Sequence, residues 1–485
     1  MTAMHTSEDE LEAVLAASWE AFEVWSASTA QRRAAALTEI AARLDAAADD
    51  LVPIALRETN LDEARLRSEV SRTTFQLRLF AEVVREGAYL DPRIDHADAT
   101  WQAGAGRPDI RRALEPLGPV LVFTASNFPF AFSVAGGDTA SALASGCSVV
   151  VKAHSGHPEL SRATAEVVSA ALDLVQAPAG LFSLVFGTET GRTALTDPRV
   201  RAGSFTGSIQ GGRALFDLAN SRPDPIPFFA EMGSINPTFV TRAADRRRGE
   251  QIAEGFLASM TLGSGQFCTK PGLLALPRGS QTLARLRSLT RPATGRLLNE
   301  RLREGYLRTL GDLVARPEIE VIGERARAFS DPPEPIILMS DVAHAIRDPE
   351  SLLIECFGPA SLVVLYDHED ELLALARTLD GQLTATIHAE SEDDVTELIR
   401  LLARRSGRLL WNQWPTGVAV TYAQQHGGPY PATTVAGSTS VGTAAIGRFL
   451  RPVAYQGFPD ERLPPALKEG NPLRLSRRVD GALQI

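Results

Sequence analysis

Cysteine is scarce in this sequence of 485 residues. The three cysteines, Cys147, Cys268 and Cys356, lie far apart and form neither a C-x-x-C pair nor the dense spacing of a small disulfide-stapled domain. The scarcity excludes a disulfide framework and a cysteine-rich zinc site, and we expect no bound metal. Each thiol therefore needs its own explanation.

The chain also lacks a basic excess and long apolar runs. It contains 49 Lys and Arg residues against 59 Asp and Glu, a net charge of −10, which argues against general nucleic-acid binding. No segment approaches the roughly 18 uninterrupted apolar residues that a membrane-spanning helix needs. The opening "MTAMHTSEDE" carries neither the basic nor the apolar part of a signal peptide. We therefore expect a cytoplasmic protein with no membrane insertion and no nucleic-acid partner.

The material for large cores is nevertheless present. Hydrophobic residues make up 44% of the chain and charged residues 22%, which is close to the average of a globular protein. The length predicts two or three packed units. From Ser7 to Gly87 apolar residues recur at helical spacing, as in "RAAALTEIAARLDAAADDL". We interpret this stretch as a helical opening segment and not as a catalytic one.

Short apolar runs alternate with helical patterns after residue 116. The runs "VLVFTA", "SVVVKA" and "LFSLVFG" are separated by helical stretches, and a second series begins near Ile235. Strands that alternate with helices predict mostly parallel sheets that are buried on both faces. Residues 92–115, rich in Gly, Pro, Asp and Arg, predict a hairpin outside the core, and the irregular residues after 448 predict a docking tail.

One cysteine lies in an unusual setting. In "TLGSGQFCTKPGL", Cys268 follows glycines and small polar residues, an environment that exposes a thiol to a reaction partner. On composition alone, a nucleophile and a loop cysteine without a role remain equally good interpretations. Cys147, beside the strand "SVVVKA", and Cys356, in "LIECFGP", have the local pattern of structural cysteines.

Glu231 is an acid among apolar residues. It stands in "PFFAEMGSINP", and a carboxyl group with apolar neighbours tends to have a raised pKa, which suits a proton acceptor near neutral pH. The alternative is a carboxylate that points to solvent from the end of a strand.

Two further segments suit a phosphate-bearing ligand. "FTGSIQGG", residues 205–212, follows an apolar run and opens a helix, so Gly207 and Ser208 can let a backbone approach a phosphate at a helix N-terminus. The segment does not match G-x-G-x-x-G. Lys152 ends a predicted parallel strand, where α/β sheets bind ligands, although a lysine in that place is often an ordinary surface residue.

These segments occur together in the order known from one family. "ASNFPFAF" with Asn127, "VVVKAH", "FTGS", "EMGSINP" and "GQFCTKPG", followed by "ECFGPASLVV", resemble the successive signatures of the aldehyde dehydrogenase superfamily over almost the whole chain. The resemblance implies an α/β fold with two doubly wound domains. A Rossmann-like dinucleotide-binding domain would span residues 1–91 and 116–234, a catalytic domain 235–447, and oligomerisation segments 92–115 and 448–485.

The resemblance also implies a mechanism. Cys268 would attack an aldehyde carbonyl to give a thiohemiacetal, whose oxyanion would be held by the side-chain amide of Asn127 and the backbone N–H of Cys268. Hydride transfer would leave a thioester. Glu231 would activate the water that hydrolyses it and could also accept the thiol proton.

The family's cofactor contacts map onto five positions. Lys152 would contact the adenosine ribose, Gly207 and Ser208 would face the pyrophosphate, Glu355 would hold the nicotinamide ribose and Phe357 would flank the nicotinamide. An acid three residues after the strand-end lysine is common in NAD-specific relatives, where it repels a 2′-phosphate. Here that position is Ser155. We therefore expect NADP to be preferred, with NAD possible.

The stretch "HGGPYPAT" resembles the branch whose members act on 2,5-dioxovalerate (α-ketoglutarate semialdehyde) or, with NADP, on fatty aldehydes. Of the two substrates, "PTGV" and "STSVG" fit 2,5-dioxovalerate slightly better. A long-chain fatty aldehyde with NADP is the alternative, followed by CoA-acylating and non-catalytic members of the fold. A carboxylated substrate needs an arginine or backbone donors near the mouth of the Cys268 site, and the sequence does not select which. Trp411 and Trp414 could instead line an apolar tunnel. The family implies a homodimer or a homotetramer.

Overall fold

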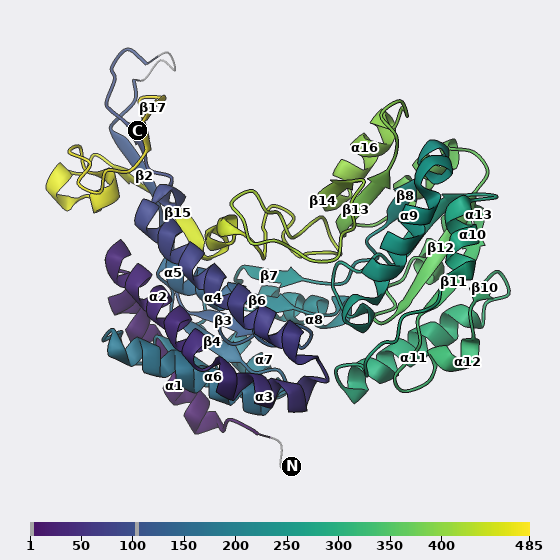
Figure 1. Ribbon diagram of the computed structural model, residues 1–485. Coiled ribbons are helices and arrows are strands. Elements are labelled where there is room, and N and C mark those ends of the chain that lie inside the picture. The colour runs from purple at the N-terminus through teal and green to yellow at the C-terminus, as the bar shows by residue number, and fades with distance from the viewer. Residues whose placement is uncertain (1–3, 102–105) are drawn as a thin grey trace.

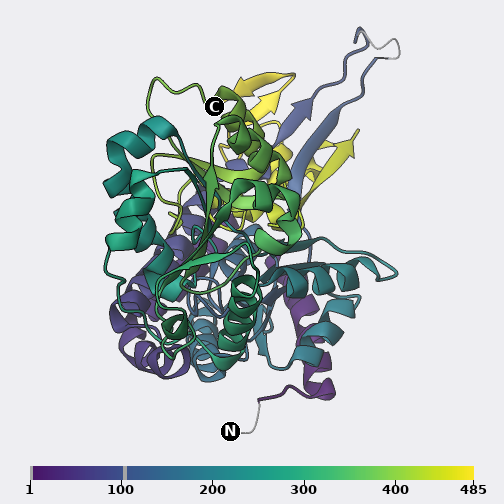
Figure 2. The ribbon, with the colours of Figure 1, turned by 90° about the vertical axis from the view of Figure 1, so that its right-hand side faces the viewer.

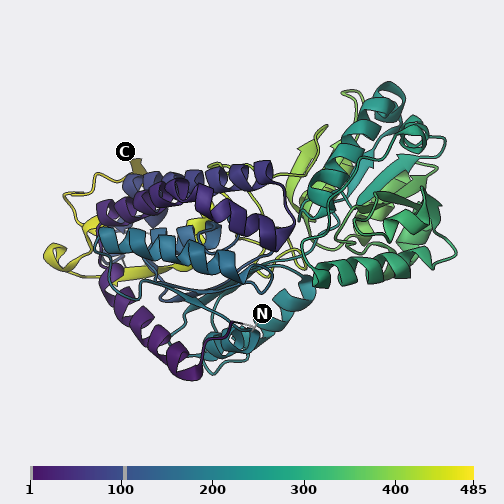
Figure 3. The same ribbon diagram turned by 60° about the horizontal axis from the view of Figure 1, so that its bottom comes forward.

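The computed structural model describes residues 4–101 and 106–485. Figure 1 shows two lobes, each built around its own sheet, with a third sheet projecting from the first lobe. Figure 3 shows the two lobes side by side, with the N-terminal helices laid over the first. None of the helices in these ranges is long and apolar enough to cross a membrane.

The first lobe opens with four helices that cover its sheet. They are α1 (Glu8–Trp25), α2 (Ala30–Ala46), α3 (Ala48–Thr59) and α4 (Glu63–Glu86). The longest of them, α4, begins at Asp62, whose side chain accepts from the Arg65 N–H at 2.8 Å, and ends at Gly87 in the left-handed conformation (φ 79°). Its apolar face, which includes Leu66 and Leu77, packs into the core of the lobe.

The sheet of the first lobe is entirely parallel, with strand order β5-β4-β3-β6-β7. Its strands are short, nearly all apolar and mostly buried, as expected of a sheet covered on both faces. The strands and intervening helices are β3 (Val120–Phe123), α5 (Gly137–Ser145), β4 (Val149–Lys152), α6 (Pro158–Leu174), β5 (Phe182–Val185), α7 (Thr188–Thr196), β6 (Ala202–Thr206), α8 (Ile209–Asn220) and β7 (Phe228–Glu231).

The register of these strands gathers functional positions at one edge. Phe123 pairs with Lys152 on one side and with Phe205 on the other, and Thr206 pairs with Glu231. The carboxyl ends of β3, β4, β6 and β7 therefore meet there. The chain leaves β3 toward β4 and returns later to β6, so strand order reverses beside β3, which is where open α/β sheets bind ligands.

The second lobe holds a seven-stranded sheet of order β10-β11-β12-β9-β8-β13-β14, in which only the edge strand β10 is antiparallel to its neighbour. Its elements are β8 (Thr238–Val240), α9 (Arg242–Thr261), β9 (Leu273–Pro277), α10 (Gln281–Ser288), α11 (Glu300–Val314), β10 (Glu320–Ile322), α12 (Arg325–Ala328), β11 (Ile336–Asp341), α13 (Val342–Arg347), α14 (Pro349–Leu352), β12 (Ala360–Tyr366), α15 (Asp370–Thr378), β13 (Gln382–His388), α16 (Thr396–Ala403) and β14 (Ser406–Trp411).

A third sheet joins two distant parts of the chain. Strands β1 (Arg93–Asp95) and β2 (Ile110–Pro116) form an antiparallel pair, and β15 (Leu450–Gln456), β16 (Arg477–Val479) and β17 (Ala482–Gln484) complete the order β15-β2-β1-β16-β17. Figure 2 shows this sheet standing away from the body of the molecule. The role of this sheet in oligomerisation stays a prediction.

An irregular segment, residues 412–442, crosses from the second lobe back to the first (Figure 1). It contains no helix or strand and is anchored on β7, where the Met232 N–H donates to the Ala432 carbonyl at 2.8 Å and the Thr434 N–H donates to the Ala230 carbonyl at 3.2 Å. A short 3-10 helix, Thr443–Phe449, then leads into β15. The segment therefore lies over the carboxyl end of β7, next to Glu231.

Candidate active site

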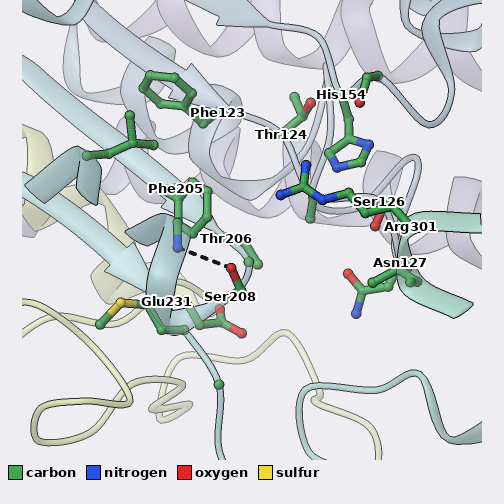
Figure 4. A pocket seen from close by; sticks show the side chains of 18 of the residues that line it. Phe123, Thr124, Ser126, Asn127, His154, Phe205, Thr206, Ser208, Glu231 and Arg301 are labelled. Carbon is green, nitrogen blue, oxygen red and sulfur yellow. Dashed lines mark hydrogen bonds between the residues drawn. The ribbon is translucent and has the colours of Figure 1, made fainter. Parts of the chain in front are cut away.

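A cavity of about 400 Å³ lies at the carboxyl ends of the first lobe's strands. Figure 4 shows Asn127 from the turn after β3, Glu231 from the end of β7 and Arg301 from the second lobe around it. All nine residues that the sequence predicted for catalysis or cofactor binding line this one cavity: Asn127, Lys152, Ser155, Gly207, Ser208, Glu231, Cys268, Glu355 and Phe357. The structure therefore brings the predicted set together.

A second cavity, of about 330 Å³, is lined by parts of α4, by the turn after β3 and by residues 417 and 418 of the crossing segment. Its lining and that of the larger cavity have one residue in common, Cys268. A group held in either cavity can therefore reach the same sulfur atom.

The glycines before Cys268 allow a left-handed backbone conformation that other residues rarely adopt. Gly263, Ser264 and Gly265 are consecutive left-handed residues, with φ of 56°, 56° and 70°. A Cβ atom on Gly265 would lie 2.2 Å from the carbonyl oxygen of Gly358. The close approach joins the Cys268 loop directly to the segment that carries Glu355 and Phe357.

The thiol of Cys268 belongs to a cluster of three side chains. Its Sγ lies 3.4 Å from Nε2 of His426, and the same nitrogen lies 2.8 Å from Oε1 of Glu231. Ser440 Oγ donates to the other carboxylate oxygen of Glu231. His426 and Glu231 are both buried. The imidazole thus lies between a thiol and a carboxylate, an arrangement that can pass a proton between them.

His426 was not identified from the sequence. It lies in "HGGPYPAT", on the irregular crossing segment, where no periodicity marks it. Local hydrogen bonds hold it: its N–H donates to Thr439 Oγ1 at 2.8 Å, and its carbonyl accepts from the Ser440 N–H at 2.9 Å. The only sequence signal was a histidine followed by two glycines.

The prediction for the pKa of Glu231 was wrong. Burial does raise the pKa of this carboxyl group, but the contact with His426 and the hydrogen bond from Ser440 outweigh it, so the pKa lies below its usual value. The apolar residues adjacent in sequence are not the groups that the carboxylate faces. Burial, together with the charge of Glu231, instead raises the pKa of Cys268 well above its usual value. The resting pair is therefore a neutral thiol and an ionised carboxylate.

The cluster also has three side chains of types that bind metals, with their ligand atoms within 4.8 Å of one another. The 2.8 Å distance between His426 and Glu231 is that of a direct contact. Ligands of one Zn²⁺ at about 2.0–2.1 Å in tetrahedral geometry are farther apart than this. The distance therefore favours proton transfer over metal coordination, and the absence of a metal stays a prediction.

Asn127 lies close to the cysteine loop. Its side-chain Nδ2 donates to the Gln266 carbonyl at 3.2 Å, two residues before Cys268. The Asn127 carbonyl in turn accepts from Arg65 Nη2 at 2.8 Å. The amide has a second N–H that can donate to an oxyanion formed at the cysteine.

The segment that follows Glu355 is held in place by a buried lysine. Lys270 Nζ donates to the carbonyls of Cys356, Gly358 and Ala360, at 2.7, 3.2 and 2.5 Å. Burial raises the pKa of Glu355 to about 7, against the opposing effect of the Lys270 charge. The segment that resembles the family's cofactor-contacting stretch is therefore fixed by an interaction that the sequence did not reveal.

The other end of the larger cavity is positively charged. Burial, followed by repulsion from Arg301, lowers the pKa of Lys152 to about 8. Arg192, Arg301 and Ser155 line the cavity with it. Glu231 and Glu355 are the carboxylates in that lining, and both act on the charge state of Cys268. The two carboxylates of the lining therefore lie close to Cys268, while Lys152 and Arg301 lie close to each other.

The cavity fits a dinucleotide. Helix α8 starts beside it, and Ser208 caps the helix by accepting from the Gly211 N–H at 3.1 Å. A Cβ atom on Gly207 would lie 2.6 Å from the ring of Phe205, and one on Gly233 would lie 2.4 Å from Glu355 Oε2. The backbone is thus bare where a helix N-terminus faces the cavity, as a bound phosphate requires.

The remaining sequence hypotheses are also resolved. Cys147 and Cys356 are buried in cores, as their local pattern indicated. Neither tryptophan lines the two cavities described: Trp411 is 45% exposed, and Trp414 packs on the ring of His388 at a centroid distance of 4.7 Å. The apolar-tunnel hypothesis is wrong for these two residues, since neither ring lines a cavity at Cys268, whereas Gly417 and Val418 of the same stretch line the smaller one.

Comparisons with known proteins agree with this geometry. The model of the Aldehyde dehydrogenase family matches residues 1–290. The chain is 43% identical to the alpha-ketoglutaric semialdehyde dehydrogenase of Acinetobacter baylyi, over 98% of this chain and 91% of that protein. It is 45% identical to alpha-ketoglutaric semialdehyde dehydrogenase 2 of Azospirillum brasilense, over 95% and 89%.

A solved structure shows the same fold at low identity. The 1-pyrroline-5-carboxylate dehydrogenase from Thermus with bound NAD superposes with a TM-score of 0.76 at 20% sequence identity, covering 93% of this chain and 86% of that one. The predicted fold class is thereby confirmed, and a nicotinamide cofactor is supported. We conclude that the chain belongs to the aldehyde dehydrogenase family and is an NAD(P)-dependent aldehyde oxidoreductase, as the order of its motifs predicted.

Proposed function

We propose that the protein oxidises α-ketoglutaric semialdehyde (2,5-dioxovalerate) to 2-oxoglutarate, with NADP as the preferred cofactor. The observation that carries the reaction is that Cys268 is common to both cavities and contacts the His426–Glu231 pair. The substrate is supported by relatives of that name at 43% and 45% identity along almost the whole chain.

The first step is the loss of the thiol proton. Burial disfavours a thiolate at Cys268, so the proton must leave to a nearby base as the sulfur attacks the carbonyl carbon. Nε2 of His426 is the nitrogen within reach of Sγ; in the tautomer that leaves this nitrogen unprotonated, it takes the thiol proton and passes it to Oε1 of Glu231. Glu231 and His426 therefore act as one proton-accepting pair.

The oxyanion of the resulting thiohemiacetal is held by Asn127 Nδ2 and the Cys268 N–H. A bound nicotinamide nucleotide supplies the hydride acceptor. Glu355, beside the segment that Lys270 fixes, and the N-terminus of α8 position that nucleotide. The acyl group is then left as a thioester on Cys268, and the Glu231–His426 pair removes a proton from the water that hydrolyses it.

The preference for NADP is supported by charge. Lys152, Arg192 and Arg301 line the same cavity as Ser155, and such cations suit a 2′-phosphate, which an acid at residue 155 would repel. NAD lacks that phosphate and gains less from the three cations.

A direct test measures kcat/KM for 2,5-dioxovalerate, a short uncarboxylated aldehyde and a long-chain fatty aldehyde, each with NAD and NADP. The proposal expects 2,5-dioxovalerate with NADP to be the best pair and the Cys268→Ala variant to form no NADPH with any aldehyde. A higher kcat/KM for the fatty aldehyde would reject the substrate, and a higher value with NAD would reject the cofactor preference.

The alternatives make different demands on the same residues. A CoA-acylating enzyme has no use for a water-activating pair, whereas Glu231 and His426 are both in place beside Cys268. A non-catalytic member of the fold has no reason to keep a nucleophile, a base and an oxyanion donor in one cavity. Added CoA should therefore not raise the rate of NADPH formation.

A further inference from the structure

Helix α4 presents polar side chains to the catalytic cysteine. Arg65, Glu69 and Arg72, spaced at i, i+4 and i+7, lie on one face of the helix and line the smaller cavity together with Cys268. Polar residues at that spacing are costly on the inner face of a helix unless they are paired or bind something. Helix α4 belongs to the opening segment that the sequence predicted to be non-catalytic. It nevertheless lines the smaller cavity at Cys268 with charged side chains.

Arg65 is fixed between aromatic rings. Its guanidinium carbon lies 4.7 Å from the ring centroid of Phe128 and 4.4 Å from that of Phe267. Nη2 donates to the Asn127 carbonyl, while the buried Nη1 has no hydrogen-bond partner among the described residues. Phe128 and Phe267 adjoin Asn127 and Cys268 in the motifs of the sequence, so the arginine and the reacting groups are held by one framework.

Arg72 is fixed less completely. Its guanidinium carbon lies 5.6 Å from the ring centroid of Phe132, and Nη1 donates to the Val418 carbonyl at 3.2 Å. Within residues 4–101 and 106–485, Nε is buried with no partner and Nη2 makes no hydrogen bond. Arg72 therefore has N–H donors that the protein itself leaves free.

The charges of this cavity do not balance. Its lining contains the guanidinium groups of Arg65 and Arg72 and one carboxyl group, Glu69. Oε1 of Glu69 already accepts from the N–H groups of Phe130 and Ala131, at 2.8 and 3.0 Å, and its nearest approach to Arg65 is 4.0 Å. With Cys268 neutral, the lining has more cations than carboxylates and an otherwise largely apolar wall, and the charge of Glu231 acts on Arg72 from outside the lining.

We propose that Arg72, supported by Arg65, binds the carboxylate of the aldehyde substrate and selects carboxylated over uncarboxylated aldehydes. The proposal rests on the proposed function and names the residues that give it specificity. An arginine donates to a carboxylate through two parallel N–H groups, and an apolar surrounding strengthens that bond. A long apolar chain would instead have to desolvate both guanidinium groups without compensation. Arg72 is the specificity-determining residue, and Arg65 also positions Asn127.

The test compares substrates in matched variants. Wild type, Arg72→Leu, Arg72→Lys and Arg67→Leu are assayed with 2,5-dioxovalerate, succinic semialdehyde and an uncarboxylated aldehyde of similar length. Arg67 is a control on the same helix, because it lies on the exposed face in ion pairs with Asp49 and Glu63. The ratio of kcat/KM between carboxylated and uncarboxylated aldehydes is the readout, since changes in Cys268 reactivity affect both substrates.

We expect Arg72→Leu to lower that ratio about 10- to 100-fold, mainly through KM, because a charge-assisted hydrogen bond is lost. Arg72→Lys should restore part of the ratio, and Arg67→Leu should keep the wild-type value. An unchanged ratio in Arg72→Leu, or a wild-type enzyme that prefers the uncarboxylated aldehyde, overturns the inference.

The two proposals can fail separately. If wild type prefers succinic semialdehyde and the ratio still depends on Arg72, the inference stands and the named substrate is wrong. If wild type prefers 2,5-dioxovalerate and the ratio is the same in all four proteins, the proposed function stands and Arg72 does not recognise the carboxylate.

Discussion

At the scale of single residues, the chemistry of this site depends on neighbours in space. Glu231 follows two phenylalanines in sequence, yet the groups around its carboxylate are His426 and Ser440, and its pKa falls where apolar surroundings would raise it. Glu355 shows the effect that was expected of Glu231, since burial raises its pKa to about 7. The pKa values of these two carboxyl groups, which line one cavity, are therefore shifted in opposite directions.

Replacing Glu231 with Gln should make the resting thiol more acidic. Burial raises the pKa of Cys268 and the charge of Glu231 raises it further, so removing that charge lowers the pKa. The pH midpoint of Cys268 alkylation by iodoacetamide should therefore move to lower pH. A midpoint that stays in place or rises would show that Glu231 is not charged next to the thiol.

Replacing His426 with Gln should move the acidic limb of the pH–rate profile. Without the imidazole, burial dominates at Glu231 and raises the pKa of its carboxyl group. Because Glu231 must be ionised to accept a proton, activity should then be lost at a higher pH than in wild type. The measurement is kcat against pH with saturating substrate, and an unmoved acidic limb would mean that His426 does not set the charge of Glu231.

At the scale of elements, the loop before Cys268 is built by close backbone packing. Gly265 has a φ of 70° and leaves no room for a Cβ next to the Gly358 carbonyl. Gly265→Ala should therefore displace the Cys268 loop, lower kcat strongly and cost roughly 1–3 kcal/mol of stability. Gly311→Ala is the control, because a Cβ there in helix α11 would meet nothing within 4 Å.

In that control the activity should be retained and the unfolding temperature unchanged or slightly higher. Equal kcat values for the two glycine variants would show that the close contact with Gly358 does not position Cys268. Thermal unfolding followed beside kcat separates a displaced loop from a protein that has failed to fold.

Whether the sequence could predict a site residue depends on the kind of element that carries it. Cys268, Glu231 and Lys152 stand at strand ends or in glycine-rich turns, where short contiguous patterns mark them. His426 and Ser440 lie on a segment without secondary structure, and hydrogen bonds between residues that are distant in sequence position them. Arg72 was missed for another reason: it lies within a strongly periodic helix whose polar inner face becomes visible only when the helix is docked.

At the scale of the whole molecule, the larger cavity takes residues from both lobes. Lys152 ends a strand of the first lobe and Arg301 begins α11 of the second, and the effect of Arg301 on the pKa of Lys152 shows that the two charges are close. The preference for a 2′-phosphate, which we propose, is therefore a property of the assembled lobes.

Replacing Arg301 with Gln should lower kcat/KM for NADP about 10-fold, with a smaller effect for NAD, because a cation that can pair with the 2′-phosphate is lost. Arg308→Gln, at an exposed position of the same helix outside the cavity lining, is the control. Equal losses with NAD and NADP would place the role of Arg301 elsewhere.

In the proposed mechanism Cys268 carries the acyl group, and Glu231, paired with His426, is needed to release it. The most direct measurement is the intact mass of the Glu231→Gln variant after incubation with 2,5-dioxovalerate and NADP, together with the NADPH formed. We expect a burst of about one NADPH per active site and a stable acyl adduct, located on Cys268 by peptide mapping. Continued turnover without an adduct, or an adduct on another residue, would contradict it.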